Sequence, residues 1–382
     1  GVGGTLFTVI TFIASALFAT ASGTGFGTIA AGMGVLYPAG LALGGHPGLL
    51  AGAIISGAAF GDNLAPVSDT TICSATSQGV DVPGVVRSRL KYALAAGGLT
   101  VAGLVIAGLV LSGSGGGSEP PAYNPWTLLM FLPVAATIFV AVKSGDIIIA
   151  ATIGIVSGAV VAVAAGLMDV VQIDVADAVK PALFTVSGEG LDRAVGGVLY
   201  TGLSSMIQVI VLALLLFGCT SIMRAGGGDE KLLAVLGRVV RGPRGAEVVI
   251  SVMVILLSAL MGLNAPAILA IGASFAAPLA KRYGISPYRT ANLLDAQSNT
   301  LCYCLPWTPA VVYTLGFAAD SAHPLTAMQV SPFVFYSFAM LAVMVVTILL
   351  GIGRKDGTRG TARRDGGPQT AEPLPELEKV ES

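Results

Sequence analysis

The sequence predicts an all-α membrane protein built from an inverted repeat, with two re-entrant hairpins and two broken transmembrane helices. Three observations lead to this prediction: an apolar composition, four apolar stretches interrupted by glycine or proline, and a 240-residue spacing that relates these interruptions in pairs. Of the 382 residues, 54% are hydrophobic and 11% are charged, and the mean hydropathy is +0.84. A chain of this composition cannot hide its apolar surface in a water-soluble globule, so it must cross a bilayer several times.

Uninterrupted apolar runs predict simple membrane spans, because each is close to the ~20 residues that a helix needs to cross a bilayer. These runs are 91–111, 126–142, 145–168, 200–222 and 333–352. The Gly/Ser-rich stretch 112–125 is expected to be an external linker, and 171–197 to be either an amphipathic surface helix or a simple connector. Residues 353–382 are polar, so we expect a disordered cytoplasmic tail.

Four further apolar stretches are interrupted where glycine or proline removes helical hydrogen bonds. The first is 5–43, a hairpin with its tip at Thr24, and the second is 48–77, a helix broken between Asp62 and Pro66. The later half repeats this order. There the hairpin is 246–280, with its tip at Asn264, and the broken helix is 288–318, interrupted between Cys302 and Pro306.

A shift of 240 residues places Pro278 on Pro38 and Pro306 on Pro66. We therefore predict that residues 1–111 are the C-terminal part of repeat 1 and that 126–352 form repeat 2. The counterparts of 126–240 would then precede residue 1, so roughly 115 residues are expected to be missing.

Positive charges in short loops predict the orientation, because Lys and Arg accumulate on the cytoplasmic side. All of the following can be cytoplasmic if both hairpins are re-entrant: Arg87, Arg89, Lys91, Lys143, Arg224, Lys231, Arg238, Arg241, Arg244, Lys281, Arg282, Arg289, Arg354 and Lys355. Each repeat then crosses five times, and an odd number inverts the second repeat. The prediction is a multi-pass protein of the cytoplasmic membrane with a cytoplasmic C-terminus.

The most informative motif is residues 61–71, Gly-Asp-Asn-Leu-Ala-Pro-Val-Ser-Asp-Thr-Thr, in which Asp62 and Asp69 flank Pro66. A charged side chain at membrane depth costs ~2.5–3.5 kcal/mol on insertion scales, so such a segment must face a cavity, an ion or another polar chain.

This motif resembles the signature of the NhaC-type sodium/proton antiporter family, and the stretch from Asn292 to Pro309 is also similar to that family. The resemblance covers nearly the whole chain before residue 353. It implies a fold of inverted repeats with two hairpins and two broken helices around a transport site. It also implies exchange of sodium for protons, although some relatives move organic anions or amino acids.

The chemistry of the residues supports an ion site independently, because sodium prefers several oxygen ligands and an unwound helix offers free carbonyl groups. A buried carboxylate also holds its proton to a higher pH than one in water, so one group can bind either cation. The expected sodium ligands are Asp62 and Asp69. The other expected site residues are Asn63, Ser68, Thr70, Thr71, Thr24, Asn264, Asp295, Asn299 and Thr300, with Gln297 on the same polar face.

Simpler roles stay open for three carboxylates. Asp69 could cap the helix that resumes after Pro66, Asp62 could be purely structural, and Asp295 could be a salt-bridged interface residue near Arg289.

The alternative function is sodium- or proton-coupled transport of a small organic anion or amino acid, although the sequence shows no arginine well inside a span to bind a carboxylate. An enzyme is not expected, because histidine clusters, reactive-cysteine arrangements and a second acidic pair at membrane depth are lacking. The expected partners are the bilayer, sodium and protons. Neither a cofactor nor nucleic acid is expected, and pairing as a homodimer stays open.

Overall fold

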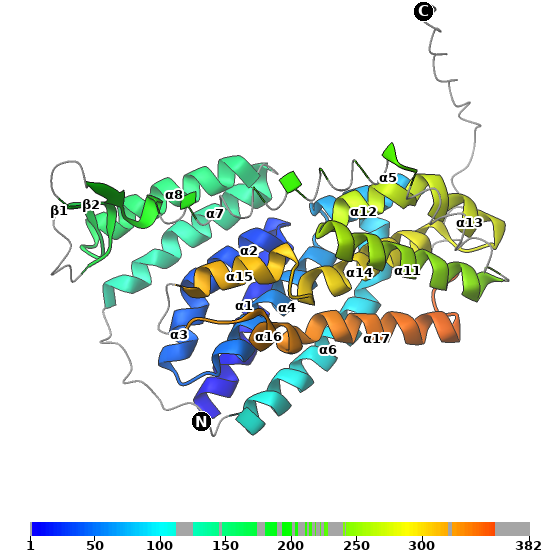
Figure 1. Ribbon diagram of the computed structural model, residues 1–382, viewed down its shortest axis with the longest axis horizontal. Coiled ribbons are helices and arrows are strands. Elements are labelled where there is room, and N and C mark those ends of the chain that lie inside the picture. The colour runs from blue at the N-terminus through cyan, green and yellow to red at the C-terminus, as the bar shows by residue number, and fades with distance from the viewer. Residues whose placement is uncertain are drawn as a thin grey trace, which may run out of the picture.

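The computed structural model describes residues 2–111, 125–144, 147–173, 180–188, 193–200, 242–319 and 323–355, with scattered positions between 203 and 240. These parts are mainly helical (Figure 1). Within these described parts, six helices are long and apolar enough to cross a membrane. The number is seven if the pair Ala327–Phe333 and Phe335–Leu350, which meet at 44°, is one span.

The first half contains two interrupted helices, as predicted. Its elements are α1 (Val2–Ser22), α2 (Gly25–Ala31), a π-helical stretch Gly32–Leu36, α3 (Tyr37–Ala42), α4 (Pro47–Leu64), α5 (Asp69–Gln78) and α6 (Val82–Leu111). Gly23 separates α1 from α2 with a φ of +69°, a conformation that glycine adopts without strain. Helix α4 ends at Leu64, because Pro66 disfavours helical geometry in the residue before it.

The middle of the chain departs from the all-α prediction. A 3₁₀ turn (Pro125–Met130), α7 (Phe131–Ser144) and α8 (Ile147–Ala164) are followed by β1 (Asp169–Ile173), β2 (Ala182–Ser187) and β3 (Ala194–Gly196). Strand β1 pairs with β2 in parallel, with Val171 opposite Phe184, and β2 pairs with β3 antiparallel. The amphipathic helix expected over 171–197 is therefore wrong, since β-branched and aromatic side chains there favour strands.

The second half repeats the order of the first. It contains α11 (Pro243–Met261), α12 (Asn264–Ile271), a π-helical stretch Gly272–Ala276, α13 (Ala277–Arg282), α14 (Pro287–Cys304), α15 (Pro309–Ala319), α16 (Ala327–Val330), a 3₁₀ turn Ser331–Phe333 and α17 (Phe335–Leu350). Gly262 ends α11 with a φ of +66°, so this interruption lies just before Asn264. The two π-helical stretches, α3 with α13, and α4 with α14 coincide in both bounds under the 240-residue shift.

Several predicted bounds shift in the structure. The span expected at 91–111 belongs to α6, which begins at Val82, and the spans expected at 126–142 and 145–168 correspond to α7 and α8. Most of 200–222, the linker 112–124 and residues 356–382 lie outside the described residues.

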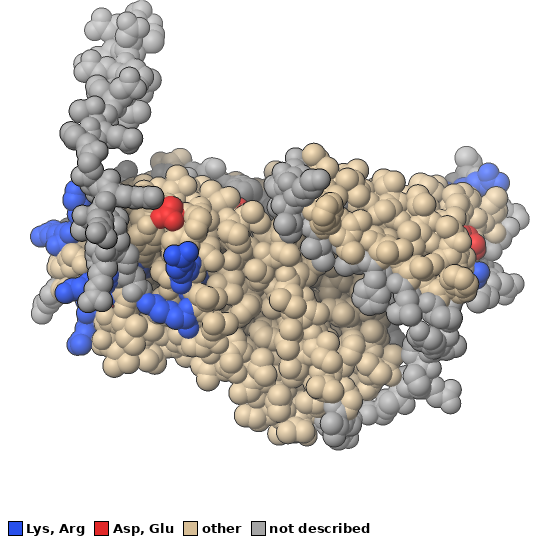
Figure 2. Space-filling view, turned by 180° about the vertical axis from the view of Figure 1, so that it is seen from behind, with Lys and Arg blue, Asp and Glu red and all other residues tan. Residues whose placement is uncertain are grey.

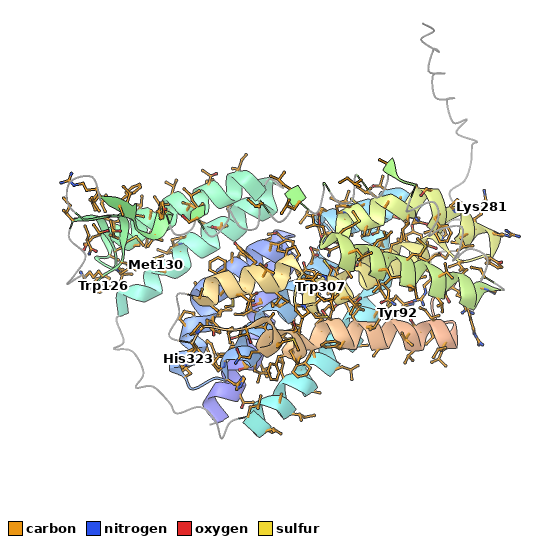
Figure 3. The ribbon with its side chains drawn as sticks, viewed as in Figure 1. Tyr92, Trp126, Met130, Lys281, Trp307 and His323 are labelled. Carbon is orange, nitrogen blue, oxygen red and sulfur yellow. The ribbon has the colours of Figure 1, made fainter. Side chains whose placement is uncertain are left out.

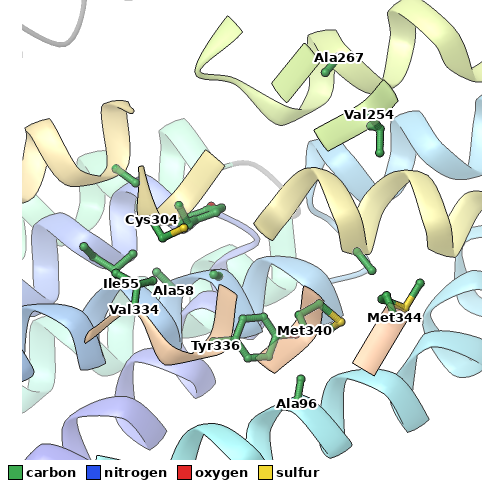
Figure 4. Packing of buried hydrophobic residues seen from close by; sticks show 14 of the residues in the cluster. Ile55, Ala58, Ala96, Val254, Ala267, Cys304, Val334, Tyr336, Met340 and Met344 are labelled. Atoms are coloured by element: carbon green, nitrogen blue, oxygen red, sulfur yellow. The ribbon is translucent and has the colours of Figure 1, made fainter. Parts of the chain in front are cut away.

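Helix α14 lies at the centre of the core and contacts α11, α17, α5, α6 and α4. Figure 4 shows Tyr336, Met340 and Met344 of α17 inside this packing, with Ala96 of α6 nearby. Small residues bring helices close together, as at Gly61 of α4, where an added Cβ would lie 2.3 Å from the Cβ of Ala19 in α1. The broken helix α4–α5 is thereby enclosed by its neighbours.

The ends of the molecule differ in charge. Figure 2 shows most of the visible Lys and Arg gathered at one end, a few charged side chains of both signs at the opposite end, and a mostly uncharged surface between them. Lys281 lies at the end rich in Lys and Arg in Figure 3, whereas Trp126 lies near the opposite end and Trp307, in the break between α14 and α15, near the centre. Exposed apolar side chains along α6, such as Leu94, Leu99 and Ile106, suit contact with lipid tails.

Candidate functional site

A cavity of about 580 Å³ lies where the turn of each half meets the break of α4–α5. Its walls come from the α1–α2 turn, the α11–α12 turn, the break and the end of α14. The lining residues are Gly23, Thr24, Gly25, Phe26, Asp62, Val67, Asp69, Ile72, Leu263, Asn264, Ala265, Pro266, Leu269 and Tyr303. The structure thus brings together both turn residues and both carboxylates that the sequence singled out.

Asp62 is the buried carboxylate of this cavity, with only 4% of its surface exposed. Ser68 Oγ donates a hydrogen bond to Oδ1 at 2.8 Å, and the Tyr303 hydroxyl donates to Oδ2 at 3.2 Å. The Ser68 hydroxyl also lies 3.0 Å from Thr70 Oγ1. Each carboxylate oxygen therefore accepts a hydrogen bond from a hydroxyl group.

Asp69 is exposed to the cavity at the first turn of α5. Its Oδ1 accepts a hydrogen bond from the backbone N–H of Thr70 at 2.8 Å. A carboxylate there also interacts favourably with the positive end of the helix dipole. The N-cap of α5 is Ser68, so the capping role considered for Asp69 is wrong. Asp69 is a first-turn residue that accepts a hydrogen bond from its own helix and also faces the cavity.

A chain of amide groups runs inward from the second turn. Asn264 Nδ2 donates to Asn299 Oδ1, and Asn299 Nδ2 donates to Asn63 Oδ1 at 3.1 Å and to Asp295 Oδ1 at 2.9 Å. Asn63 Nδ2 in turn donates to the Tyr336 hydroxyl at 3.3 Å. These contacts link the α11–α12 turn to the end of α4.

Asp295 lies off the cavity in an ion pair with Arg89, with 2.5 Å between Oδ2 and Nη1 and both side chains fully buried. The expectation that Arg89 is a cytoplasmic loop charge is wrong, because α6 begins at Val82 and carries Arg89 into the core. The statement that no arginine lies well inside a span is wrong for the same reason.

Arg289 is also buried rather than in a loop, and its guanidinium carbon lies 5.3 Å from the ring centroid of Tyr92. Its Nε donates to Glu247 Oε1 at 2.8 Å, so it is not the partner of Asp295. Arg354 Nη2 lies 2.7 Å from the other oxygen of Glu247. This network joins the ends of α11 and α14 to the end of α17.

The remaining predicted residues differ in their proximity to the cavity. Thr24 lines it, and its Oγ1 caps α2 by accepting a hydrogen bond from the Gly27 N–H at 3.2 Å. Thr71 contacts Asp295 instead, through Oγ1 at 3.1 Å from Oδ2. Thr300 is buried and donates to the backbone carbonyl of Gln297 at 2.6 Å, away from the cavity.

Among the described residues that line the cavity, Tyr303 is the polar one that sequence reasoning did not select. Its ring stacks on Phe26 with 6.3 Å between centroids, and its hydroxyl reaches Asp62 across the two halves. The available signal was the 240-residue shift, which aligns Tyr303 with Asn63 in the acidic motif.

The described residues contain no group of three or more His, Cys, Asp or Glu side chains that could hold a metal ion. The oxygens that face or adjoin the cavity instead come from two carboxylates, hydroxyl groups and an amide. Such ligands suit a hard monovalent cation or a proton.

Comparison with known proteins identifies the family. The family model described as "Na+/H+ antiporter family" matches residues 4–109 and 112–352. A Bacillus subtilis (strain 168) protein described as "Malate-2H(+)/Na(+)-lactate antiporter" is 37% identical over 91 residues, which cover 24% of this chain and 19% of that protein. No solved structure shows a significant match. The family is one of multi-pass membrane transporters, in agreement with the prediction that the chain is not an enzyme. The chain belongs to the Na+/H+ antiporter family.

Proposed function

We propose that the protein is a secondary active transporter that exchanges sodium for protons, and that Asp62 is the group for which the two cations compete. The observation that carries this proposal is the composition of the cavity wall. Asp62 and Asp69 line it, whereas Lys, Arg and His are absent from its described lining. A water-accessible space with two carboxylates and no cationic side chain attracts cations.

The hydrogen bonds around Asp62 suit this competition. Ser68 and Tyr303 donate to the ionised carboxylate, and a sodium ion or a proton would each neutralise it. Asp69, Thr24 and Asn264 are proposed to add oxygen ligands from the surrounding wall. Binding of one cation then excludes the other, and alternating access of the cavity to the two membrane faces yields exchange.

The transport topology remains part of the proposal. We propose that the second half is an inverted copy of the first, and that α1–α3 and α11–α13 are re-entrant hairpins. The matching bounds of α4 and α14 support a repeat. The position of both turns beside the break of α4–α5 supports re-entry, since a turn between two complete crossings would lie at a membrane surface.

A second candidate is coupled transport of a small organic anion. The cavity volume of about 580 Å³ lies in the range of ligand pockets, ~300–1,000 Å³, and exceeds the needs of a bare ion. The description of the Bacillus subtilis relative names two organic acids, malate and lactate. The match to this relative covers 19% of its length. In this alternative, Asp62 would carry the coupling cation while the wider cavity holds the solute.

Proteoliposomes that contain the full-length protein test both candidates. A sodium gradient is imposed and the internal pH is followed, first without and then with added malate or lactate. Sodium-dependent proton flux without a solute, lost in Asp62→Asn, is the expected result. Asp81→Asn is the matched control, because Asp81 is an exposed carboxylate outside the cavity. Flux that requires an organic acid would favour the second candidate, and wild-type rates in Asp62→Asn and Asp69→Asn would refute the site.

A further inference from the structure

The guanidinium of Arg89 lies where a free cation would find suitable ligands. Its Nη1 is 2.5 Å from Asp295 Oδ2, 2.6 Å from the backbone oxygen of Asn63 and 3.1 Å from Thr71 Oγ1. These three groups are a carboxylate, a carbonyl at the end of a broken helix and a hydroxyl. They are the kinds of oxygen that bind sodium in transporters with discontinuous helices.

Arg89 is the only positive charge that contacts Asp295 within the described parts of the chain. The other groups that contact this carboxylate are neutral, and they include Ser74 Oγ at 3.4 Å, Asn299 Nδ2 at 2.9 Å and Thr71 Oγ1 at 3.1 Å. Both charged side chains have no exposed surface. The charge of Asp295 is therefore balanced by a group that is covalently part of the protein.

One buried donor of the Arg89–Asp295 ion pair makes no hydrogen bond. Arg89 Nη2 is buried and has no hydrogen-bond partner in the structure, although Nε donates to Asn292 Oδ1 at 3.2 Å. An unpaired donor of this kind costs free energy.

We propose that Arg89 is a tethered cation, which fills an internal cation site formed by Asp295, Asn63 and Thr71. Only the carboxylates that line the cavity then take up exchangeable ions. The statement that Arg89 fills the internal site does not depend on the proposed function. The statement that only the cavity carboxylates take up exchangeable ions rests on it.

Removal of the guanidinium should open the internal site. A buried carboxylate without a partner is strongly disfavoured, so at alkaline pH, where protons are scarce, Asp295 would recruit a sodium ion in place of the guanidinium. Arg89→Gln should therefore bind one more sodium ion per protomer than the wild type at alkaline pH. Arg89→Lys keeps the charge and should bind the same number as the wild type.

Equilibrium binding of ²²Na⁺ to the purified full-length protein in detergent tests this expectation. The variants are Arg89→Gln and the double variant Arg89→Gln/Asp295→Asn, which removes both charges and should return to the wild-type number. Size-exclusion chromatography establishes that each variant is folded. An unchanged number of bound ions in folded Arg89→Gln would overturn the proposal, as would an extra ion in the double variant.

A second comparison decides the matter if Arg89→Gln does not fold. Asp295→Asn leaves Arg89 as an unbalanced charge close to the cavity, and the repulsion should weaken sodium binding about tenfold. The double variant should restore it, whereas wild-type affinity in Asp295→Asn would contradict the proposal. If the wild-type protein binds sodium but does not exchange it for protons, only the proposed function is refuted. The numbers of sodium ions bound by the wild type and the variants would still test the proposal for Arg89.

Discussion

Asp62 accepts one hydrogen bond from a side chain of each half of the chain. Ser68 lies six residues further along the same half, whereas Tyr303 comes from α14 in the other. The ionisation of this carboxylate therefore depends on the positions of elements that are distant in sequence. A change in the packing of α14 against α4 would be transmitted directly to the proposed cation site.

Tyr303→Phe should weaken sodium binding without unfolding the protein. The variant keeps the ring that stacks on Phe26 and loses the hydroxyl that donates to Asp62. A hydrogen bond to a charged group contributes ~1.5–3 kcal/mol, so the apparent sodium affinity at fixed pH should fall about tenfold or more. Because protons then compete better, the pH of half-maximal exchange should rise.

Sodium titration of exchange at several pH values measures this effect. Tyr283→Phe is the control, because its hydroxyl donates to the Val240 carbonyl away from the cavity. Equal pH profiles for Tyr303→Phe and the wild type would show that the hydroxyl is unimportant.

At the scale of elements, the α1–α2 turn is shaped by a close approach to Tyr303. A Cβ on Gly25 would lie 1.9 Å from the Tyr303 hydroxyl oxygen, whereas a Cβ on Gly34 would meet no atom within 4 Å. Gly25→Ala should therefore displace Tyr303 from Asp62 and reduce exchange at least as much as Tyr303→Phe. Gly34→Ala, the control, should retain wild-type exchange. Proteoliposome flux compares the two, and equal activity would contradict the close approach.

The carboxylate of Asp81 caps the start of α6, and its contribution to the stability of the fold depends on pH. Asp81 Oδ2 accepts a hydrogen bond from the Gly84 N–H at 2.7 Å, and Oδ1 accepts one from the Tyr288 hydroxyl. The Tyr288 bond, followed by the Gly84 bond, holds the pKa of Asp81 below its ordinary value of 3.8. The ionised form thus stabilises the fold above pH 3.8, and this contribution is lost as the pH falls through the lower folded-state pKa.

Asp81→Ala should lower the stability of the protein by about 0.5–2 kcal/mol at neutral pH, the usual cost of losing an N-cap. Thermal denaturation in detergent measures the apparent midpoint. The difference from the wild type should shrink in acid below the pKa of Asp81, and Asp81→Asn should retain most of the cap. A difference between Asp81→Ala and the wild type that persists unchanged at acid pH would argue against an ionised cap.

At the scale of the whole molecule, most of the visible Lys and Arg gather at one end (Figure 2). Arg244, Lys281, Arg282 and Lys355 are exposed, whereas Arg89 and Arg289 are buried. Under the positive-inside rule, we therefore still propose this end as the cytoplasmic one. Fewer charges support this orientation than the sequence suggested, because Arg89 and Arg289 are buried.

The proposed inversion predicts that equivalent loops lie on opposite sides of the membrane. Loops α3–α4 and α13–α14 are related by the 240-residue shift. Leu43 is exposed in the first loop, and Lys281 is exposed in the last turn of α13, just before the second. With native cysteines replaced by serine, Leu43→Cys should react with an impermeant maleimide on intact cells. Lys281→Cys should react only after permeabilisation. Labelling of both on intact cells would exclude the inversion.

The sequence alone determined the class of the protein and the approximate positions of its interruptions. Composition fixes membrane residence, and Pro66 and Gly23 end helices through local backbone constraints, so the breaks at 65–68 and 23–24 could be predicted. The acidic motif singled out Asp62 and Asp69 through another local argument, because a carboxylate in an apolar stretch needs a polar environment.

Only the tertiary structure decided which groups surround these residues. Arg89 reads as a loop charge beside Arg87 and Lys91, and its burial depends on how α6 packs against α14, more than two hundred residues away. Tyr303 approaches Asp62 across a similar separation. Local patterns specify where a helix ends, but the partners of a buried charge follow from long-range packing, which no segment of the chain encodes by itself.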